Sequence, residues 1–180
     1  MAELRGLTDE EVKQVCHEPP PETQGTNLNH IMYRIKDPKA SLDFYTRILG
    51  MRLLRRGDMP GMKFTVYFLG FENAADIPKD DAERRKWVLT RRSVLELTHN
   101  YGTESDPDFK GYCNGNTDPG RGYGHIALVV PDLEKACERY EQLGVKFIKR
   151  PQDGSMRGLA FIEDPDGYRV EILSSAIREA

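Results

Sequence analysis

Apolar residues follow two rhythms along this chain, one typical of strands and one typical of helices. Runs of β-branched and aromatic residues such as HIMYRI (30–35) and KFTVYFLGF (63–71) predict strands. Between these two runs, apolar residues recur every three or four positions up to Gly50, which predicts a helix that ends there. Two further strand-like runs in this half are MRLLRR (51–56) and SVLELTH (93–99).

The same order of elements returns in the second half of the chain. HIALVVPDLEKACERYEQLGVK (125–146) resembles HIMYRIKDPKASLDFYTRILGM (30–51), and each segment pairs an opening strand with a helix that starts near a proline. The strand-like runs VKFIKR, GLAFIED and YRVEILS follow, with a tight turn predicted at 164–167. The expected buried faces of the two helices are Leu42, Tyr45, Ile48 and Leu49, and Leu133, Ala136, Tyr140 and Leu143. Each half is therefore predicted to be a βαβββ module, which makes the protein α+β.

The chain divides into four predicted parts. These are an N-terminal helical arm (1–25), a first module (26–101) with a polar insertion (72–92), an inter-module loop (102–124) and a second module (125–176). In the arm, Thr8 and Glu11 have the spacing of a capping box, which predicts a helix as far as Glu18, before Pro19. The insertion is predicted to contain a helix that packs Trp87. The inter-module loop is rich in Gly, Asn and Asp, and loops of this length are usually functional or mobile.

Composition and charge exclude several classes of protein. Hydrophobic residues make up 38% and charged residues 31%, and no run approaches the roughly 18 apolar residues of a membrane span. The net charge of −3 is spread along the chain, which argues against nucleic acid as a partner because phosphate binding needs a concentrated basic face. The basic cluster Arg52, Arg55 and Arg56 is interpreted as solvated strand surface.

The cysteines and the N-terminal segment predict a reducing compartment. Cys16, Cys113 and Cys137 are odd in number, widely separated and without a CxxC pair, so we expect free thiols. The N-terminal segment lacks the apolar core of a secretory signal and is too acidic for a transit peptide. A cytoplasmic location is therefore predicted.

Two ionisable residues recur at matching places in the two modules. His30 and His125 each begin the first strand, and Glu96 and Glu171 each lie in the last strand between apolar neighbours. Taken singly, each glutamate could face solvent and each histidine could end a strand edge. The duplication favours a metal site instead, because a pseudo-two-fold axis can bring the four groups together and a metal offsets the cost of burying a carboxylate. Two imidazoles and two carboxylates suit zinc, nickel, cobalt or manganese and leave positions open for substrate.

The alternation of side chains between the two faces of a strand adds two residues to this candidate site. Period two puts Arg34 on the face of His30 and Asn100 on the face of Glu96, so both are candidates for gripping an anionic substrate. His99 falls on the opposite face and His17 in the arm, and both are excluded as ligands.

The motifs RIKDPKASLDFYTRILGM, MKFTVYFLGFE, YCNGNTDP, GYGHIAL, ERYEQLGVKF and GLAFIEDPDGYRVEIL together resemble the glyoxalase I (lactoylglutathione lyase) family over nearly everything after residue 25. The resemblance implies the vicinal-oxygen-chelate fold and a homodimer whose active sites each take ligands from both subunits. It also implies a lyase of methylglyoxal detoxification, which converts the hemithioacetal of methylglyoxal and glutathione into S-D-lactoylglutathione through a metal-bound enediolate.

The resemblance also assigns roles to individual residues. It implies that His30, Glu96, His125 and Glu171 are the metal ligands, that Glu171 is the catalytic base, and that Glu96 is a second catalytic carboxylate able to serve the other substrate configuration. The residues implied to bind or cover glutathione are Arg34, Asn100, Arg121, Lys149 and Met156. Three positions depart from the family pattern: Ser155, Gly120 and Arg169. The first two are expected to weaken glutathione binding or to alter its loop, which makes Arg121 a less secure assignment than Arg34, and the metal ligands are unaffected.

The identity of the metal and the class of reaction each have an alternative interpretation. The insertion and the long arm resemble zinc-using members, which favours Zn²⁺, whereas a histidine at position 30 resembles members activated by Ni²⁺ or Co²⁺. An extradiol dioxygenase would use two histidines and one glutamate, and Glu96 would obstruct its open site. A protein that only sequesters a small molecule would need no metal, and an inactive structural homologue would need none of the four ligands.

Overall fold

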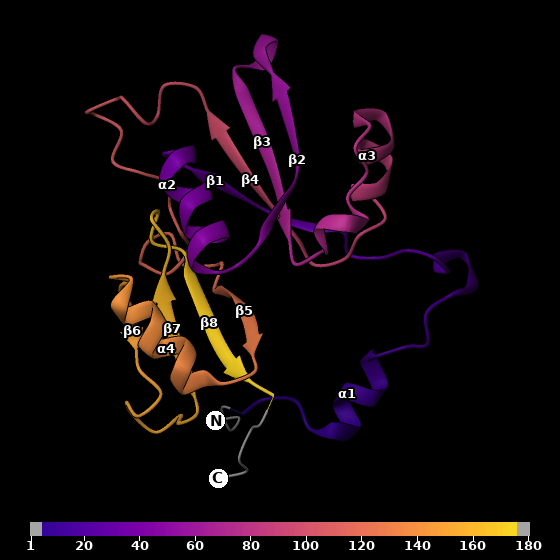
Figure 1. Cartoon of the computed structure of the whole chain (residues 1–180). Coiled ribbons are helices and arrows are strands. Elements are labelled where there is room, and N and C mark those ends of the chain that lie inside the picture. The colour runs from indigo at the N-terminus through magenta and orange to yellow at the C-terminus, as the bar shows by residue number, and fades with distance from the viewer. Residues whose placement is uncertain (1–4, 176–180) are drawn as a thin grey trace.

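The computed structural model describes residues 5–175, which form two modules, an arm and a long connecting loop (Figure 1). The fold predicted from the sequence, α+β with two βαβββ modules, is confirmed. Residues 1–4 of the predicted arm and residue 176 of the predicted second module lie outside the described residues. No helix among the described residues is long and apolar enough to cross a membrane.

The first module is a four-stranded mixed sheet. Its elements are β1 (His30–Ile35), α2 (Pro38–Asp43), β2 (Arg52–Met59), β3 (Phe64–Gly70), α3 (Asp81–Val88) and β4 (Val94–Asn100). The strand order is β1-β4-β3-β2, with β1 and β4 parallel and the other neighbours antiparallel. The side chain of Asp37 caps α2 by accepting a hydrogen bond from the backbone N–H of Lys39. A π-helical turn follows α2, and the chain leaves it at Gly50, whose φ of 82° favours glycine.

The second module repeats this plan with shorter strands. Its elements are β5 (His125–Val130), α4 (Leu133–Gln142), β6 (Phe147–Lys149), β7 (Leu159–Glu163) and β8 (Arg169–Ser174). The strand order is β5-β8-β7-β6, and β5 and β8 are the parallel pair. Asp132 caps α4 by accepting a hydrogen bond from the backbone N–H of Lys135. The predicted turn between β7 and β8 is present, with the N–H of Gly167 donating to the carbonyl of Asp164 over 3.0 Å.

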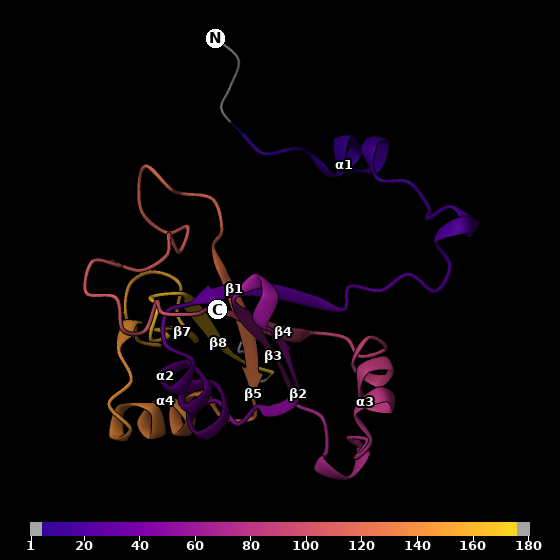
Figure 2. The ribbon, with the colours of Figure 1, turned by 90° about the horizontal axis from the view of Figure 1, so that it is seen from above.

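One hydrophobic core joins the two modules. It contains the inner faces of both sheets together with α2, the π-helical turn and α4, and α2 and α4 overlap in the view from above in Figure 2. Arg139 of α4 donates hydrogen bonds to the carbonyl oxygens of Arg47 and Ile48 in the π-helical turn. Of the predicted helix faces, Leu143 departs from the expectation, since it is 37% exposed at the C-cap of α4, beyond the core. The members of these faces that lie fully in the core are Tyr45, Ile48, Leu49, Leu133 and Tyr140, with Leu42 and Ala136 packed against it.

The opposite face of the first sheet carries a smaller cluster, covered by the insertion. Leu54, Val66, Phe68, Val88 and Val94 are buried there. The insertion forms α3 as predicted, and its Trp87 packs against this cluster. The insertion also reaches the end of the sheet where β1 begins, since the side chain of Asn29 donates hydrogen bonds to the carbonyl oxygens of Val88 and Arg91.

The turn between β7 and β8 fastens the second module to the first. Asp166 accepts hydrogen bonds from the backbone N–H of Lys36 (2.9 Å) and from the hydroxyl of Ser41 (3.3 Å). Asp164 accepts one from the buried hydroxyl of Tyr45 (2.8 Å), and the ring of Tyr168 stacks on that of Tyr33 in the first module. The relative placement of the two sheets thus depends on buried polar contacts as well as on the core.

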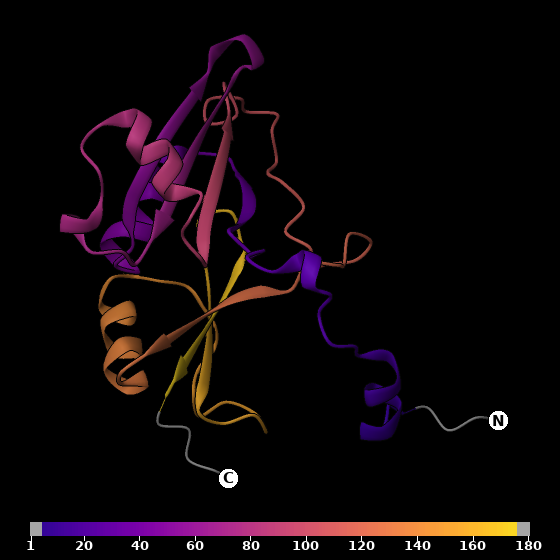
Figure 3. The same cartoon turned by 90° about the vertical axis from the view of Figure 1, so that its right-hand side faces the viewer.

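The N-terminal arm extends away from both sheets (Figure 3). Its helix α1 (Asp9–Val15) has the predicted capping box between Thr8 and Glu11, and it buries no residue. The helix ends at Val15, earlier than the predicted Glu18, because the ring of Pro19 would clash with the carbonyl four residues before it in a continued helix.

Candidate metal and substrate site

The first half of the candidate site is a histidine and a glutamate on neighbouring parallel strands. His30 opens β1 and Glu96 lies in β4, and the imidazole Nε2 is 3.2 Å from the carboxylate Oε2. Glu96 is only 15% exposed, and its other oxygen accepts a hydrogen bond from the hydroxyl of Thr98 over 3.2 Å. The Nδ1 of His30 lies 2.8 Å from the side-chain oxygen of Asn29, which orients the ring so that Nε2 points toward Glu96.

The second half repeats the first in the second module. His125 opens β5 and Glu171 lies in β8, with Nε2 and Oε2 again 3.2 Å apart and Glu171 again 15% exposed. Two donors that each lie about 2.1 Å from one ion in a right-angle arrangement are about 3 Å apart, so both pairs have the spacing of two ligands of one ion. The donor set, one imidazole nitrogen and one carboxylate oxygen in each pair, fits a divalent metal.

One chain does not bring the four predicted ligands together. Each pair lies on its own sheet, and among residues 5–175 no three histidine, cysteine, aspartate or glutamate side chains are close enough to hold one ion. An internal pseudo-two-fold axis therefore relates the two pairs without making them converge. The two histidines do line a common cleft of about 770 Å³ between the modules, and its other walls are mainly apolar.

Each pair also has an aromatic neighbour that sequence reasoning did not single out. Phe68 of β3 stands beside Glu96 in register, and its ring meets that of His30 edge-on, with centroids 5.7 Å apart. Phe161 of β7 has the same relation to Glu171 and His125, at 5.1 Å. The signal was present in the sequence, because the motifs VYFLGF and GLAFIED place a phenylalanine at the same step of each repeat.

Arg34 and Asn100 lie where the strand alternation put them. Arg34 pairs in register with Thr98, two residues beyond Glu96 on the same face of the sheet. Asn100 ends β4, and its side-chain oxygen accepts a hydrogen bond from the hydroxyl of Tyr112 in the inter-module loop. Met32, Arg34 and Tyr112 border a second hollow of about 490 Å³ beside this loop.

The other three predicted substrate contacts belong to the second module and the loop before it. Arg121 is exposed, with its Nε 3.4 Å from Asp118. The ammonium of Lys149 in β6 donates to the carbonyl oxygens of Arg150 and Leu159. Met156 is 63% exposed on the loop between β6 and β7. None of the three lies on the sheet that carries Arg34 and Asn100.

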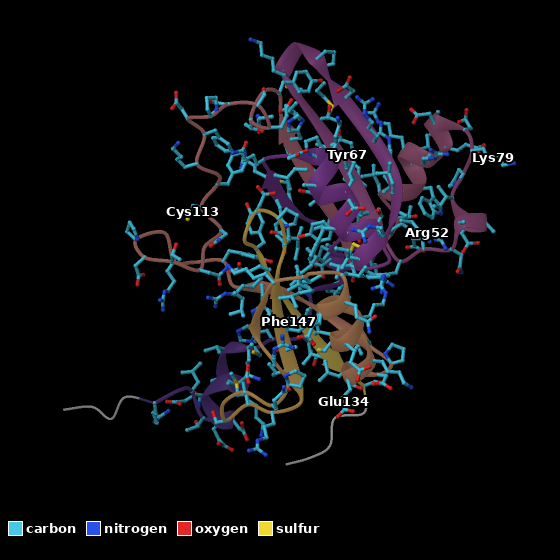
Figure 4. All side chains as sticks on the ribbon, turned by 60° about the vertical axis from the view of Figure 1, so that its left-hand side comes forward. Arg52, Tyr67, Lys79, Cys113, Glu134 and Phe147 are labelled. Carbon is cyan, nitrogen blue, oxygen red and sulfur yellow. The ribbon has the colours of Figure 1, made fainter. Side chains whose placement is uncertain are left out.

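The structure also shows the surroundings of two residues that depart from the family pattern, Gly120 and Arg169, and of His99, which was excluded as a metal ligand. A Cβ at Gly120 would lie too close to the sulfur of Cys113, so a larger residue there would force the exposed Cys113 side chain to move. Figure 4 shows the loop with Cys113 projecting from one side of the molecule and Lys79 on the opposite side. His99 is buried and its Nε2 contacts Glu104 at 2.7 Å, which gives this histidine a partner away from the candidate ligands. Arg169 pairs in register with His125.

The chain has two similar sheets, and each carries one histidine–glutamate pair suited to a metal. Comparison with known families identifies the class of proteins that has this arrangement. Residues 27–172 match the family described as the Glyoxalase/Bleomycin resistance protein/Dioxygenase superfamily. The chain therefore belongs to this superfamily.

Particular relatives narrow the class further. A lactoylglutathione lyase from Pseudomonas aeruginosa is 53% identical over 163 residues, which cover 91% of this chain and 90% of that protein. One from Pseudomonas putida is 54% identical over 153 residues, 85% of this chain and 87% of that protein. Among solved structures, the trypanothione-dependent glyoxalase I of Leishmania major is 31% identical with a TM-score of 0.61, covering 83% of this chain and 87% of that one. The predicted family resemblance is confirmed.

Proposed function

We propose that this chain is a glyoxalase I whose active sites are each completed by two copies of the chain. The activity is that of the lactoylglutathione lyases to which the chain is 53–54% identical over most of its length. It converts the hemithioacetal of methylglyoxal and glutathione into S-D-lactoylglutathione, and so detoxifies methylglyoxal. The main support for a metal site is the repeated histidine–glutamate pair, His30–Glu96 and His125–Glu171, in which the two donor atoms lie 3.2 Å apart.

The separation of the two pairs supports a dimer. If the first module of one chain faces the second module of another, each interface joins one His30–Glu96 pair to one His125–Glu171 pair. A two-fold dimer then has two such sites. The cleft beside the two histidines offers an apolar contact surface, since Leu28 is 73% and Val129 65% exposed there.

Glu171 is the proposed base. Its carboxylate removes the proton from the carbon that bears sulfur and returns it to the neighbouring carbon, while Glu96 stands on the other side for a substrate of the opposite configuration. His30, Glu96, His125 and Glu171 would hold a divalent ion, which would supply the positive charge that acidifies this C–H and offsets the developing negative charge. The low exposure of both carboxylates keeps bulk water from competing for the proton.

The glutathione half of the substrate is assigned to two groups of residues. Arg34 and Asn100 come from the first module, and Arg121, Lys149 and Met156 come from the second module of the other chain and the loop before it. The two guanidinium groups suit the carboxylates of glutathione, because an arginine can bind a carboxylate through two parallel hydrogen bonds. The proposed compartment is the cytoplasm, supported by three cysteines that are all free thiols.

Metal removal and replacement test the function. We expect metal-stripped protein to lose hemithioacetal isomerisation and to recover it when a divalent ion is added, with Zn²⁺ the proposed native metal. The readout is formation of the thioester in the ultraviolet, with Zn²⁺, Ni²⁺ and Co²⁺ added separately. Recovery with Ni²⁺ or Co²⁺ alone would overturn the zinc assignment and keep the reaction. Tight binding of glutathione conjugates without turnover under any metal would instead indicate a sequestering protein.

A further inference from the structure

Arg55 has an environment that its place in a basic cluster did not predict. It lies in β2, its Nε is buried, and that nitrogen has no hydrogen-bond partner, a situation found at no other buried side-chain nitrogen or oxygen among residues 5–175. Its side chain also forms no ion pair with any other described residue. The interpretation of Arg55 as solvated surface is therefore wrong for this residue, because a register shift between Leu53 and Arg55 turns it toward the face that carries Val66 and Phe68.

The neighbouring arginine shows the contrast within the same strand. Arg56 points to the other face, where its guanidinium lies 3.2 Å from Asp58. Arg55 instead extends over Gly57, where the Cβ of any larger residue would lie 3.0 Å from its Nη1 and 3.1 Å from Val66. An arginine stays charged in proteins, and a buried donor without a partner costs free energy, so the buried Nε–H of Arg55 is a donor that an acceptor from a ligand could satisfy.

The strand register places Arg55 on the face of the first sheet that carries the candidate ligand Glu96. Arg55 pairs with Phe68, Phe68 pairs with Glu96, and the three side chains share one face of the sheet. Two strand spacings, about 10 Å, separate the backbone of Arg55 from that of Glu96. A substituent of the size of an aromatic ring or a short chain would extend from the metal ligands to the guanidinium along an apolar wall.

The second module has a cation at the equivalent position. Lys149 pairs with Phe161, Phe161 pairs with Glu171, and the register shifts between Phe147 and Lys149 as it does before Arg55. Phe147 marks this strand in Figure 4. In the proposed two-chain site, the internal symmetry puts Arg55 of one chain and Lys149 of the other on opposite sides of the four ligands. Lys149 is assigned to glutathione, and Arg34 lies on β1, at the opposite edge of the sheet from Arg55 on β2. We therefore assign Arg55 to the aldehyde-derived half of the substrate.

We propose that Arg55 is a specificity-determining residue that binds an anionic group, such as a carboxylate, on the aldehyde-derived half of the substrate. The proposal rests on the proposed glyoxalase I site. The favoured substrates are hemithioacetals of glutathione with 2-oxoaldehydes that carry a carboxylate about one ring length from the ketone. Charge-assisted hydrogen bonds to the guanidinium fork would select them over neutral analogues of the same size.

The test compares two aldehydes in three proteins. The measured quantity is the ratio of kcat/KM for the glutathione hemithioacetal of 4-carboxyphenylglyoxal to that of phenylglyoxal. We expect Arg55→Gln to lower this ratio about tenfold or more relative to the wild type, as expected for loss of a charged hydrogen bond. Arg56→Gln, the matched control on the opposite face, is expected to leave the ratio within about twofold. A ratio that is equal in the wild type and Arg55→Gln would overturn the proposal and assign Arg55 to packing.

A binding measurement tests the role of Arg55 independently of the proposed glyoxalase I activity. Dissociation constants of S-(4-carboxybenzyl)glutathione and S-benzylglutathione require no turnover, and Arg55→Gln should weaken the carboxylated conjugate alone, about tenfold. If the wild type binds both conjugates with this preference but does not isomerise the methylglyoxal hemithioacetal, the glyoxalase function fails and the role of Arg55 stands. Equal loss of affinity for both conjugates would overturn the role of Arg55.

Discussion

At His30 and at His125, the imidazole meets a carboxylate and the edge of a phenylalanine ring in nearly the same geometry. Each histidine, glutamate and phenylalanine of one module therefore has a counterpart in the other, so the effect of replacing one residue can be compared with that of its counterpart. Glu171 and Glu96 complete different halves of the proposed site, and Glu171 is the carboxylate assigned to proton transfer.

Replacement of Glu171 by glutamine tests that assignment. The amide keeps an oxygen for the metal but cannot accept the substrate proton, so turnover should fall by about 10²-fold or more while bound metal is retained. Steady-state kinetics and metal content by mass spectrometry measure the two effects. Glu163→Gln is the matched control, because Glu163 lies on the same sheet and pairs with Lys146. Near-normal turnover in Glu171→Gln would reject this residue as the base.

At the scale of the element, short capped helices hold the two sheets in place. α4 contributes Leu133, Cys137 and Tyr140 to the core, and its first turn is closed by the side chain of Asp132. The cap satisfies a backbone N–H that has no partner within the helix. The ion pair between Asp132 and Lys135 is exposed and adds little.

Loss of this cap should weaken the fold by a measurable amount. Asp132→Ala is expected to lower the free energy of unfolding by about 1 kcal/mol, measured by urea denaturation. Asp132→Asn keeps a side-chain oxygen at the cap and should stay within about 0.5 kcal/mol of the wild type. If alanine and asparagine destabilise the protein equally, the cap is not the source of the stability.

At the scale of the whole molecule, two junctions determine whether the site forms. One lies within the chain, where the turn between β7 and β8 joins the second module to the first. The other is the proposed contact between two chains, which brings the two ligand pairs together. The first can be followed by its pH dependence and the second by mixing inactive variants.

Asp164 gives the junction within the chain its pH dependence. Burial raises the pKa of this carboxyl from its usual 3.8 to about 7, and the hydrogen bond from Tyr45 only partly opposes the shift. Between about pH 4 and 7 the folded protein holds a proton that the unfolded chain has lost, so the contribution of Asp164 to stability falls as the pH rises. The difference in unfolding free energy between the wild type and Asp164→Asn should fall by about 2–3 kcal/mol from pH 5 to pH 7.5.

A control for this prediction comes from Asp132. The backbone N–H of Lys135 lowers the pKa of Asp132, so this group is ionised in both states across the same range. The corresponding difference for Asp132→Asn should be flat from pH 5 to pH 7.5. An equally flat difference for Asp164→Asn would mean that Asp164 is ionised in the folded protein throughout.

Mixing two inactive variants tests the junction between chains. His30→Ala damages the first half of every site, and Glu171→Gln damages the second half. A shared site predicts that a mixed dimer regains one intact site, so random exchange should restore about a quarter of wild-type turnover, since half the dimers are mixed. Unfolding and refolding the two variants together, with each refolded alone as the control, provides the measurement. No recovery would place each complete site within a single chain.

The sequence by itself determined the features that depend on local periodicity and on repetition. Strand alternation, helix caps and the two copies of one motif predicted both modules, the insertion helix, the four candidate ligands and the faces of Arg34 and Asn100. Only the tertiary structure decided that the two ligand pairs lie apart on separate sheets and that Phe68 and Phe161 support them. It also decided that the turn at Asp164 packs on the first module and that Arg55 turns toward the face of the sheet that carries Phe68 and Glu96. These features depend on strand register and on packing between distant segments, and neither is encoded in the spacing of neighbouring residues.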